Sequence, residues 1–260
     1  MLTQTTMQIG NADLAIFSRG QAKPAVIFMA GGLCDHRSWL PQLLDLQVEN
    51  QLIALDPRGC GMSQGSGPYD ISQQASDIAT VISMKIAEPC VIVSHSMGGY
   101  AALLLNQRHP EFVLANVFID VPLSETGSNI TRIVDALEKA RSLTPLKPMV
   151  ESMGMLATKE VRDIIQEMML TRSVEVAAGM LSHLDTVTND ISALIAKVGM
   201  KPCLTIFPGP RPAGGDPVWL ARTFPSIEQK MIQGVGHFVQ LEQPETVNSM
   251  LIEFFDSICA

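Results

Sequence analysis

The amino-acid sequence predicts an α/β fold in which a mostly parallel central sheet is wound by helices and carries an all-helical insertion. Short runs of apolar residues alternate with helix-like segments along most of the chain, which is typical of parallel strands covered on both faces. Residues 122–199 break this alternation, because they have helical periodicity and no convincing strand. The chain has 260 residues, 47% of them hydrophobic, and is long enough to bury one large core.

Apolar runs mark the expected strands of the sheet. They are residues 25–30, 51–55, 90–94, 116–120, 203–207 and 230–233. The alternation of strands with helices favours a parallel sheet connected by right-handed crossovers. Residues 246–258 are expected to close the chain as an amphipathic helix, because their apolar side chains recur on one side.

The insertion at residues 122–199 is expected to cover the carboxyl edge of the sheet as a cap, which leaves residues 1–121 and 200–260 as the core of the fold. Its predicted helices are 129–142, 146–156, 159–184 with a break near Thr171, and 190–198. The cap contains six methionines, which either fill gaps in the core or line a flexible apolar pocket. These are Met149, Met153, Met155, Met168, Met169 and Met180.

Charge and composition limit the kind of partner. The formal net charge is −8 and there is no basic cluster, which argues against nucleic acid and an anionic membrane as partners. The five cysteines show no C-x-x-C or metal-ligand spacing, so we expect a reduced, cytoplasmic protein with no metal and no other cofactor. We find no signal-peptide pattern and no apolar run long enough to span a bilayer. The oligomeric state is left open.

The stretch CVIVSHSMGGYAAL, residues 90–103, predicts a nucleophile at a sharp turn between a strand and a helix. Ser96 stands at the apex of this turn. The usual pattern is G-x-S-x-G, and here Ser94 replaces the first glycine while Gly98 keeps the second. The residues two positions from the apex must be small to avoid a collision of strand and helix. Serine adds only a hydroxymethyl group, so Ser94 weakens the pattern without breaking the steric rule.

Together with this turn, the segments MAGGLCDHRSW and GVGHFVQLEQPE resemble motifs of the α/β-hydrolase superfamily, and the resemblance covers most of the chain. It implies that His237 is the base. It also implies an oxyanion hole made by the backbone N–H groups of Gly32 and Met97. The sequence departs from the family at Ala30–Gly31, where a His-Gly pair is usual. The segment DPRGCGMS resembles a family loop that we interpret as structural, with Asp56 and Arg58 tying the turn together.

Two aspartates are candidates for the acid that orients His237. The superfamily usually places this acid a few residues after the strand that ends at Phe207, where the first carboxylate is Asp216, beyond a Pro/Gly-rich stretch. The alternative is Asp120, which ends the preceding strand; some members of the superfamily place their acid there. The carboxyl ends of strands are where an α/β sheet builds its site. We favour Asp120.

These residues predict a serine hydrolase in which Ser96 attacks, His237 transfers the proton and Asp120 holds the histidine. The cap and the small number of charged residues near the motifs favour a small-molecule substrate, an ester or lactone with an apolar body. Two arginines, Arg37 and Arg211, lie near the motifs and could bind an anionic group.

Two other functions stay open at this point. The chain also resembles cofactor-independent dioxygenases of this fold, in which a His–Asp pair is the base and the serine positions the substrate; a carbon–carbon bond hydrolase belongs with this alternative. A non-enzymatic ligand receptor that retains the three residues is the other. His36 could face the substrate, whereas His95 in the turn has no implied chemistry and His183 in the cap is interpreted as a packing or surface residue.

Overall fold

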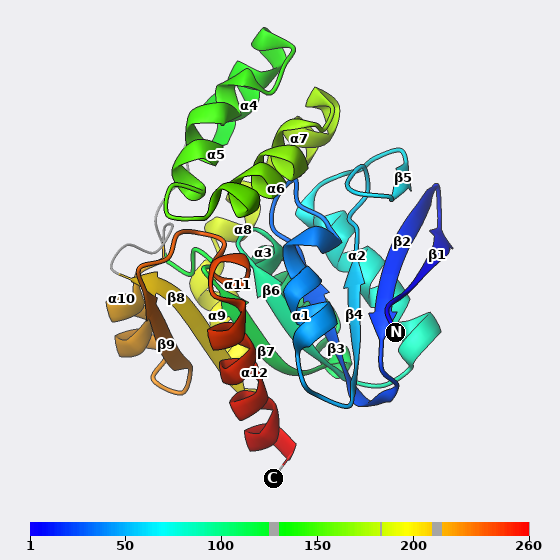
Figure 1. Cartoon of the computed structure of the whole chain (residues 1–260), viewed down its shortest axis with the longest axis vertical. Coiled ribbons are helices and arrows are strands. Elements are labelled where there is room, and N and C mark those ends of the chain that lie inside the picture. The colour runs from blue at the N-terminus through cyan, green and yellow to red at the C-terminus, as the bar shows by residue number, and fades with distance from the viewer. Residues whose placement is uncertain (125–129, 183, 210–214, 260) are drawn as a thin grey trace.

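A sheet of mostly parallel strands forms the centre of the molecule in the computed structural model, which describes residues 1–124, 130–182, 184–209 and 215–259 (Figure 1). The strand order is β1-β2-β4-β3-β6-β7-β8-β9, with β5 paired to β2. All pairs from β4 to β9 are parallel, and β1, β2 and β5 pair antiparallel. The strands are β1 Thr3–Ile9, β2 Ala12–Arg19, β3 Ala22–Met29, β4 Asn50–Leu55, β5 Gln64–Gly65, β6 Cys90–His95, β7 Val113–Ile119, β8 Cys203–Gly209 and β9 Glu228–Gln233.

The predicted fold class is confirmed, and each apolar run forms a strand. The antiparallel hairpin of β1 and β2 was not predicted from the sequence. Most side chains of β1 are exposed, and its polar sequence TQTTMQI contains no apolar run. An antiparallel strand at the edge of a sheet is buried on one face at most. It therefore lacks the continuous apolar run that marks the central strands.

Helices cover both faces of the sheet. On one face α2, α3 and α9 pack together, and on the other α1 packs against α12; Figure 1 shows α1 and α12 in front of the sheet. These helices and short turns are α1 Leu40–Asp45, α2 Ile71–Val81, α3 Gly98–Arg108, α9 Ile191–Val198, α10 Pro217–Thr223, α11 Val239–Glu242, α12 Pro244–Cys259, η1 His36–Trp39, η2 Ile82–Ile86 and η3 Pro110–Phe112. In the described ranges, no helix combines the length and apolar character needed to cross a membrane.

The regular secondary structure of the insertion between β7 and β8 consists of helices, and its described residues form no strand. Its elements before α9 are α4 Ile130–Ala140, η4 Thr144–Leu146, α5 Lys147–Met153, α6 Lys159–Leu170, α7 Val174–Leu181 and α8 Leu184–Thr188. The break expected near Thr171 lies between α6 and α7, where the Ser173 hydroxyl caps α7 by accepting from the Val176 amide at 3.1 Å. Figure 1 shows α4 to α7 standing beyond one end of the sheet.

Candidate active site

Ser96 occupies a strained turn between β6 and α3. Its φ angle is +50°, a left-handed conformation that non-glycine residues rarely adopt. The Ser96 amide donates to the Ile119 carbonyl at 3.1 Å, and the Ser96 carbonyl accepts from the Gly99 amide at 2.9 Å. The surrounding backbone therefore holds the serine in this conformation, which presents its hydroxyl at the carboxyl edge of the sheet.

The neighbours of Ser96 fit the steric rule for this turn. A methyl group built on Gly98 would lie 2.5 Å from the Ala30 carbonyl oxygen, so only glycine fits there. Ser94 is fully buried, and its hydroxyl donates to the Val117 carbonyl at 3.3 Å. The hydroxyl at this unusual position is thus bonded to the neighbouring strand, and the serine is accommodated where the family pattern has glycine.

Ser96, His237 and Asp120 form a connected line of hydrogen bonds. Ser96 Oγ lies 2.9 Å from His237 Nε2, and His237 Nδ1 lies 2.6 Å from Asp120 Oδ2. A carboxylate can only accept, so Nδ1 carries the proton and Nε2 is free to accept from the serine hydroxyl. All three residues are at most 9% exposed.

Sheet register explains how Asp120 reaches this position. Strands β6 and β7 are neighbours, and His95 pairs with Ile119. Ser96 and Asp120 each follow directly after these paired residues, so they leave the sheet at the same edge. Asp120 has a φ angle of +43° and its amide donates to the Ile206 carbonyl at 2.9 Å.

The other candidate acid has a different role. Asp216 is exposed and caps α10, where its carboxylate accepts from the Trp219 amide at 2.9 Å. Asp120, and not Asp216, is therefore the aspartate hydrogen-bonded to His237.

The loop that carries His237 is held on both sides by one carboxylate. Glu242 accepts from the Gly236 amide at 2.8 Å and from the Phe238 amide at 3.2 Å. The His237 amide itself donates to the Met153 carbonyl of α5 at 3.3 Å. Burial raises the pKa of Glu242, and the two amide hydrogen bonds oppose that rise. Glu242 belongs to the motif GVGHFVQLEQPE, but its contact with the His237 loop was not predicted from the sequence.

His95 is a second residue that contacts the base and was given no chemistry from the sequence. It is fully buried, and its Nε2 lies 2.9 Å from the His237 carbonyl oxygen. The carbonyl can only accept, so Nε2 is the protonated nitrogen. The two imidazole centroids are 4.6 Å apart. Burial, and then the nearby His237, hold the pKa of His95 well below its usual value, so the ring is neutral.

A cavity of about 280 Å³ opens above Ser96 and His237, and no charged side chain is found among its described lining residues. Four methionines of the insertion form part of the cavity wall, as expected if these side chains line a pocket: Met149, Met153, Met169 and Met180. Met168 is buried elsewhere, and Met155 is exposed. The lining residues include Leu146, Met149, Met153, Met169, Met180, Leu181, Leu184 and Phe238.

The two residues proposed for the oxyanion hole, Gly32 and Met97, both line this cavity beside Ser96. Within the described part of the chain, neither backbone N–H donates to another protein group. Both donors are therefore available to a ligand. Cys34 also lines the cavity, but burial raises the pKa of its thiol well above the usual value, so it is not a thiolate nucleophile.

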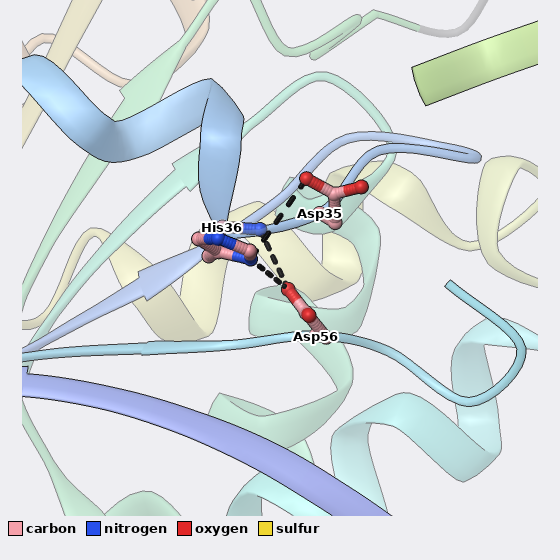
Figure 2. A group of neighbouring side chains, drawn as sticks. All are labelled: Asp35, His36 and Asp56. Carbon is pink, nitrogen blue, oxygen red and sulfur yellow. Dashed lines mark hydrogen bonds and ion pairs between the residues drawn. The ribbon is translucent and has the colours of Figure 1, made fainter. Parts of the chain in front are cut away.

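His36 is turned away from this cavity. Figure 2 shows it with Asp35 and Asp56, a group whose ligand atoms lie within 4.8 Å of one another. Asp56 accepts from His36 Nδ1 at 2.9 Å and from the His36 and Met62 amides, each at 2.7 Å. The His36 ring stacks on Phe17 with centroids 3.6 Å apart. His36 is not among the residues that line the cavity, so the possibility that it faces the substrate finds no support here.

Hydrogen bonds within the protein occupy the oxygens of this group, so it is a structural network rather than an open metal site. Asp35 accepts from Arg37 Nε at 2.9 Å and from a second Arg37 nitrogen at 2.8 Å. Arg58 has the structural role expected for it, because it pairs with Asp77 at 2.7 and 2.9 Å.

The remaining charged and titratable candidates from the sequence are Arg37, His183 and Arg211. Arg37 is paired with Asp35 and Glu167, and it is not among the lining residues. His183 and Arg211 lie outside the described residues.

Comparison with known proteins places the chain in a family. A sequence profile of the alpha/beta hydrolase family matches residues 26–250, and the chain belongs to this family. The sn-1-specific diacylglycerol lipase ABHD11 of Mus musculus is 24% identical over 256 residues, which are 89% of this chain and 80% of the mouse protein. Lipase LipV of Mycobacterium tuberculosis is 30% identical over 125 residues, and the match covers 48% of this chain and 48% of the lipase.

A solved structure agrees with the fold. A thermophilic esterase from Thermogutta terrifontis matches with a TM-score of 0.83 at 21% identity, and the match covers 98% of this chain and 99% of that chain. The family match and the lipases among the curated relatives support a hydrolase role for this protein.

Proposed function

We propose that this protein is a serine hydrolase that cleaves an ester or lactone bond of a small apolar substrate. The observation that carries the proposal is the line of hydrogen bonds from Ser96 through His237 to Asp120, with distances of 2.9 and 2.6 Å, at the floor of a cavity whose described lining residues include no charged side chain. A nucleophile, a base and an orienting acid in this geometry are the parts that acyl transfer requires.

In this mechanism Ser96 Oγ attacks the acyl carbon while its proton passes to His237 Nε2. The carbonyl oxygen becomes an oxyanion that accepts from the Gly32 and Met97 amides. The proton then moves from Nε2 to the departing alcohol oxygen, which leaves an acyl group on Ser96. Water attacks this ester while its proton passes to His237 Nε2; His237 then returns the proton to Ser96 Oγ as the bond between Oγ and the acyl carbon breaks and the acid leaves. Asp120 keeps the proton on Nδ1 throughout and balances the charge of the imidazolium.

The hydrogen bond between Ser96 and His237 favours a hydrolase over an enzyme that uses only the His–Asp pair, because it places His237 Nε2 where it can take the proton of the serine hydroxyl. The cavity walls favour an apolar substrate body. We also propose that residues 122–199 act as a cap, since Met149, Met153 and Met180 form part of these walls. The lipase names of the mouse and mycobacterial relatives are in line with ester cleavage.

The experiment is a screen of p-nitrophenyl esters of increasing acyl length, together with lactones, on the wild type and Ser96→Ala. The wild type should hydrolyse an apolar ester and be labelled at Ser96 by a fluorophosphonate. Ser96→Ala should lose several orders of magnitude of activity. A folded Ser96→Ala variant with unchanged turnover would overturn the proposal. Oxygen uptake with a hydroxyquinolone, and no ester hydrolysis, would instead indicate the dioxygenase.

A further inference from the structure

The loop between β3 and η1, residues 30–35, carries the proposed oxyanion donor Gly32 and is contacted by the insertion. Leu33 is one of the residues of the loop that make this contact. It is 3% exposed and has a φ angle of +62°. The Leu33 amide donates to Met180 Sδ at 3.4 Å, and the Leu33 carbonyl accepts from Arg172 Nε at 3.3 Å. Both polar backbone groups of Leu33 are therefore engaged by side chains from the insertion.

Arg172, between α6 and α7, is itself held firmly. Its side chain is 10% exposed, and one of its terminal nitrogens donates to Asp35 Oδ2 at 2.6 Å. Asp35 is fully buried and pairs with Arg37 as well. Burial would raise the pKa of Asp35, but hydrogen bonds to Arg37 and the charges of Arg37 and Arg172 outweigh it, and the pKa lies below its usual value. The carboxylate is thus charged and keeps the guanidinium in place.

We propose that Arg172 is a positioning residue that fixes the direction of the Gly32 N–H in the oxyanion hole. Gly31 and Gly32 have no side chains to limit backbone rotation, so the loop needs a constraint on its far side. A left-handed Leu33 persists only when its surroundings hold it there. The planar guanidinium supplies this constraint, because it binds the Leu33 carbonyl and Asp35 with two nitrogens of one rigid group. The inference rests on the proposed function, in which the Gly32 amide binds the oxyanion.

Arg37 provides a matched control. It donates to the same carboxylate, Asp35, and it also reaches the insertion through Glu167 at 2.7 Å. Among the described residues, only Arg172 of this pair donates to Leu33. If Arg172 only docks the insertion or neutralises Asp35, replacing either arginine should lower kcat to a similar extent. If Arg172 positions the oxyanion hole, only its replacement should lower kcat.

The test is steady-state kinetics of Arg172→Met, Arg172→Lys and Arg37→Met on an ester that the wild type hydrolyses. Loss of an entire oxyanion donor lowers kcat by about 10²- to 10³-fold, so a misdirected donor should lower it by about 10- to 100-fold. We expect this loss in Arg172→Met, with KM changed less than about threefold. Arg172→Lys should recover thermal stability through its charge but not kcat, because one ammonium cannot span both acceptors. Arg37→Met should keep kcat.

An equal loss of kcat in Arg37→Met, or full recovery of kcat in Arg172→Lys, would overturn the inference. Amide hydrogen exchange of residues 30–35 gives a second measurement that needs no substrate. Exchange should be faster in Arg172→Met than in Arg37→Met, and equal exchange contradicts the proposal. If the wild type hydrolyses no ester and Ser96 is not labelled, the proposed function fails, and hydrogen exchange alone decides whether Arg172 holds this loop.

Discussion

The imidazole Nε2–H of His95 donates to the backbone carbonyl of His237 at 2.9 Å. This bond joins the residue before Ser96 to the residue that holds the Ser96 hydroxyl, so the nucleophile turn and the base loop are tied together within the protein interior. The remaining nitrogen, His95 Nδ1, is buried and has no hydrogen-bond partner in the described structure. A ring in this environment cannot take up a proton without a large cost, which has consequences for stability at acid pH.

Stability should fall at acid pH because of His95. Burial, and then the neighbouring His237, lower its pKa in the folded state. Below the ordinary histidine pKa of about 6.5, the unfolded chain binds a proton at this residue and the folded chain does not. The free energy of unfolding therefore decreases as pH falls, by up to ~1.4 kcal/mol per pH unit from this group. Urea unfolding of the wild type and His95→Asn between pH 7.5 and 5 measures the effect.

The difference in stability between these two proteins should shrink as the pH falls, because only the wild type has this buried titratable ring. Histidines common to both proteins cancel in the comparison. Parallel pH profiles would mean that His95 is protonated equally easily in the folded and unfolded states.

Removing the carboxylate of Glu242 should misplace His237. Glutamine offers one acceptor oxygen for the two amides of Gly236 and Phe238, and its NH₂ group would face an N–H donor. A displacement of the base near 1 Å costs about 10²-fold in rate, so we expect kcat to fall between ~10- and ~100-fold in Glu242→Gln. Ester hydrolysis measures it, with Glu245→Gln, an exposed site on α12, as the control. Equal activity of both variants would show that the Glu242 carboxylate does not position His237.

Asp120→Asn should lower turnover by about 10⁴-fold, because asparagine cannot balance an imidazolium and can favour the wrong tautomer of His237. Asp216→Asn should keep turnover near the wild-type value, because Asp216 caps α10 at the surface. Steady-state kinetics of both variants, with circular dichroism to check folding, separates the two candidates. A large loss in Asp216→Asn and a small one in Asp120→Asn would reverse the assignment.

Ser96→Gly should be more stable than Ser96→Ala, although both lose the nucleophile. At a φ angle of +50°, alanine keeps the steric strain of the native serine and glycine relieves it. We expect a difference of about 1 kcal/mol in the free energy of unfolding, measured in urea. If alanine proved equally stable, the turn would have relaxed out of the left-handed region in that variant.

Local patterns were sufficient for most of the fold. Buried parallel strands are continuous apolar runs, so such runs in the sequence predict β3, β4, β6, β7, β8 and β9. The break between α6 and α7 near Thr171 was also predicted. The hairpin of β1 and β2 was missed, and only β1 is a mostly exposed edge strand without an apolar run; β2 is largely buried between β1 and β4.

The sequence by itself determined the nucleophile and base candidates, because Ser96 and His237 each stand in a short motif whose meaning depends on adjacent residues. It left the acid open between Asp120 and Asp216, and it gave no role to His95, Glu242 or Arg172. Only the tertiary structure shows which groups these residues contact, since His237 and Asp120 are separated by 117 positions and meet through strand order and register. Contacts between residues so far apart are set by the packing of whole elements, which no local pattern encodes.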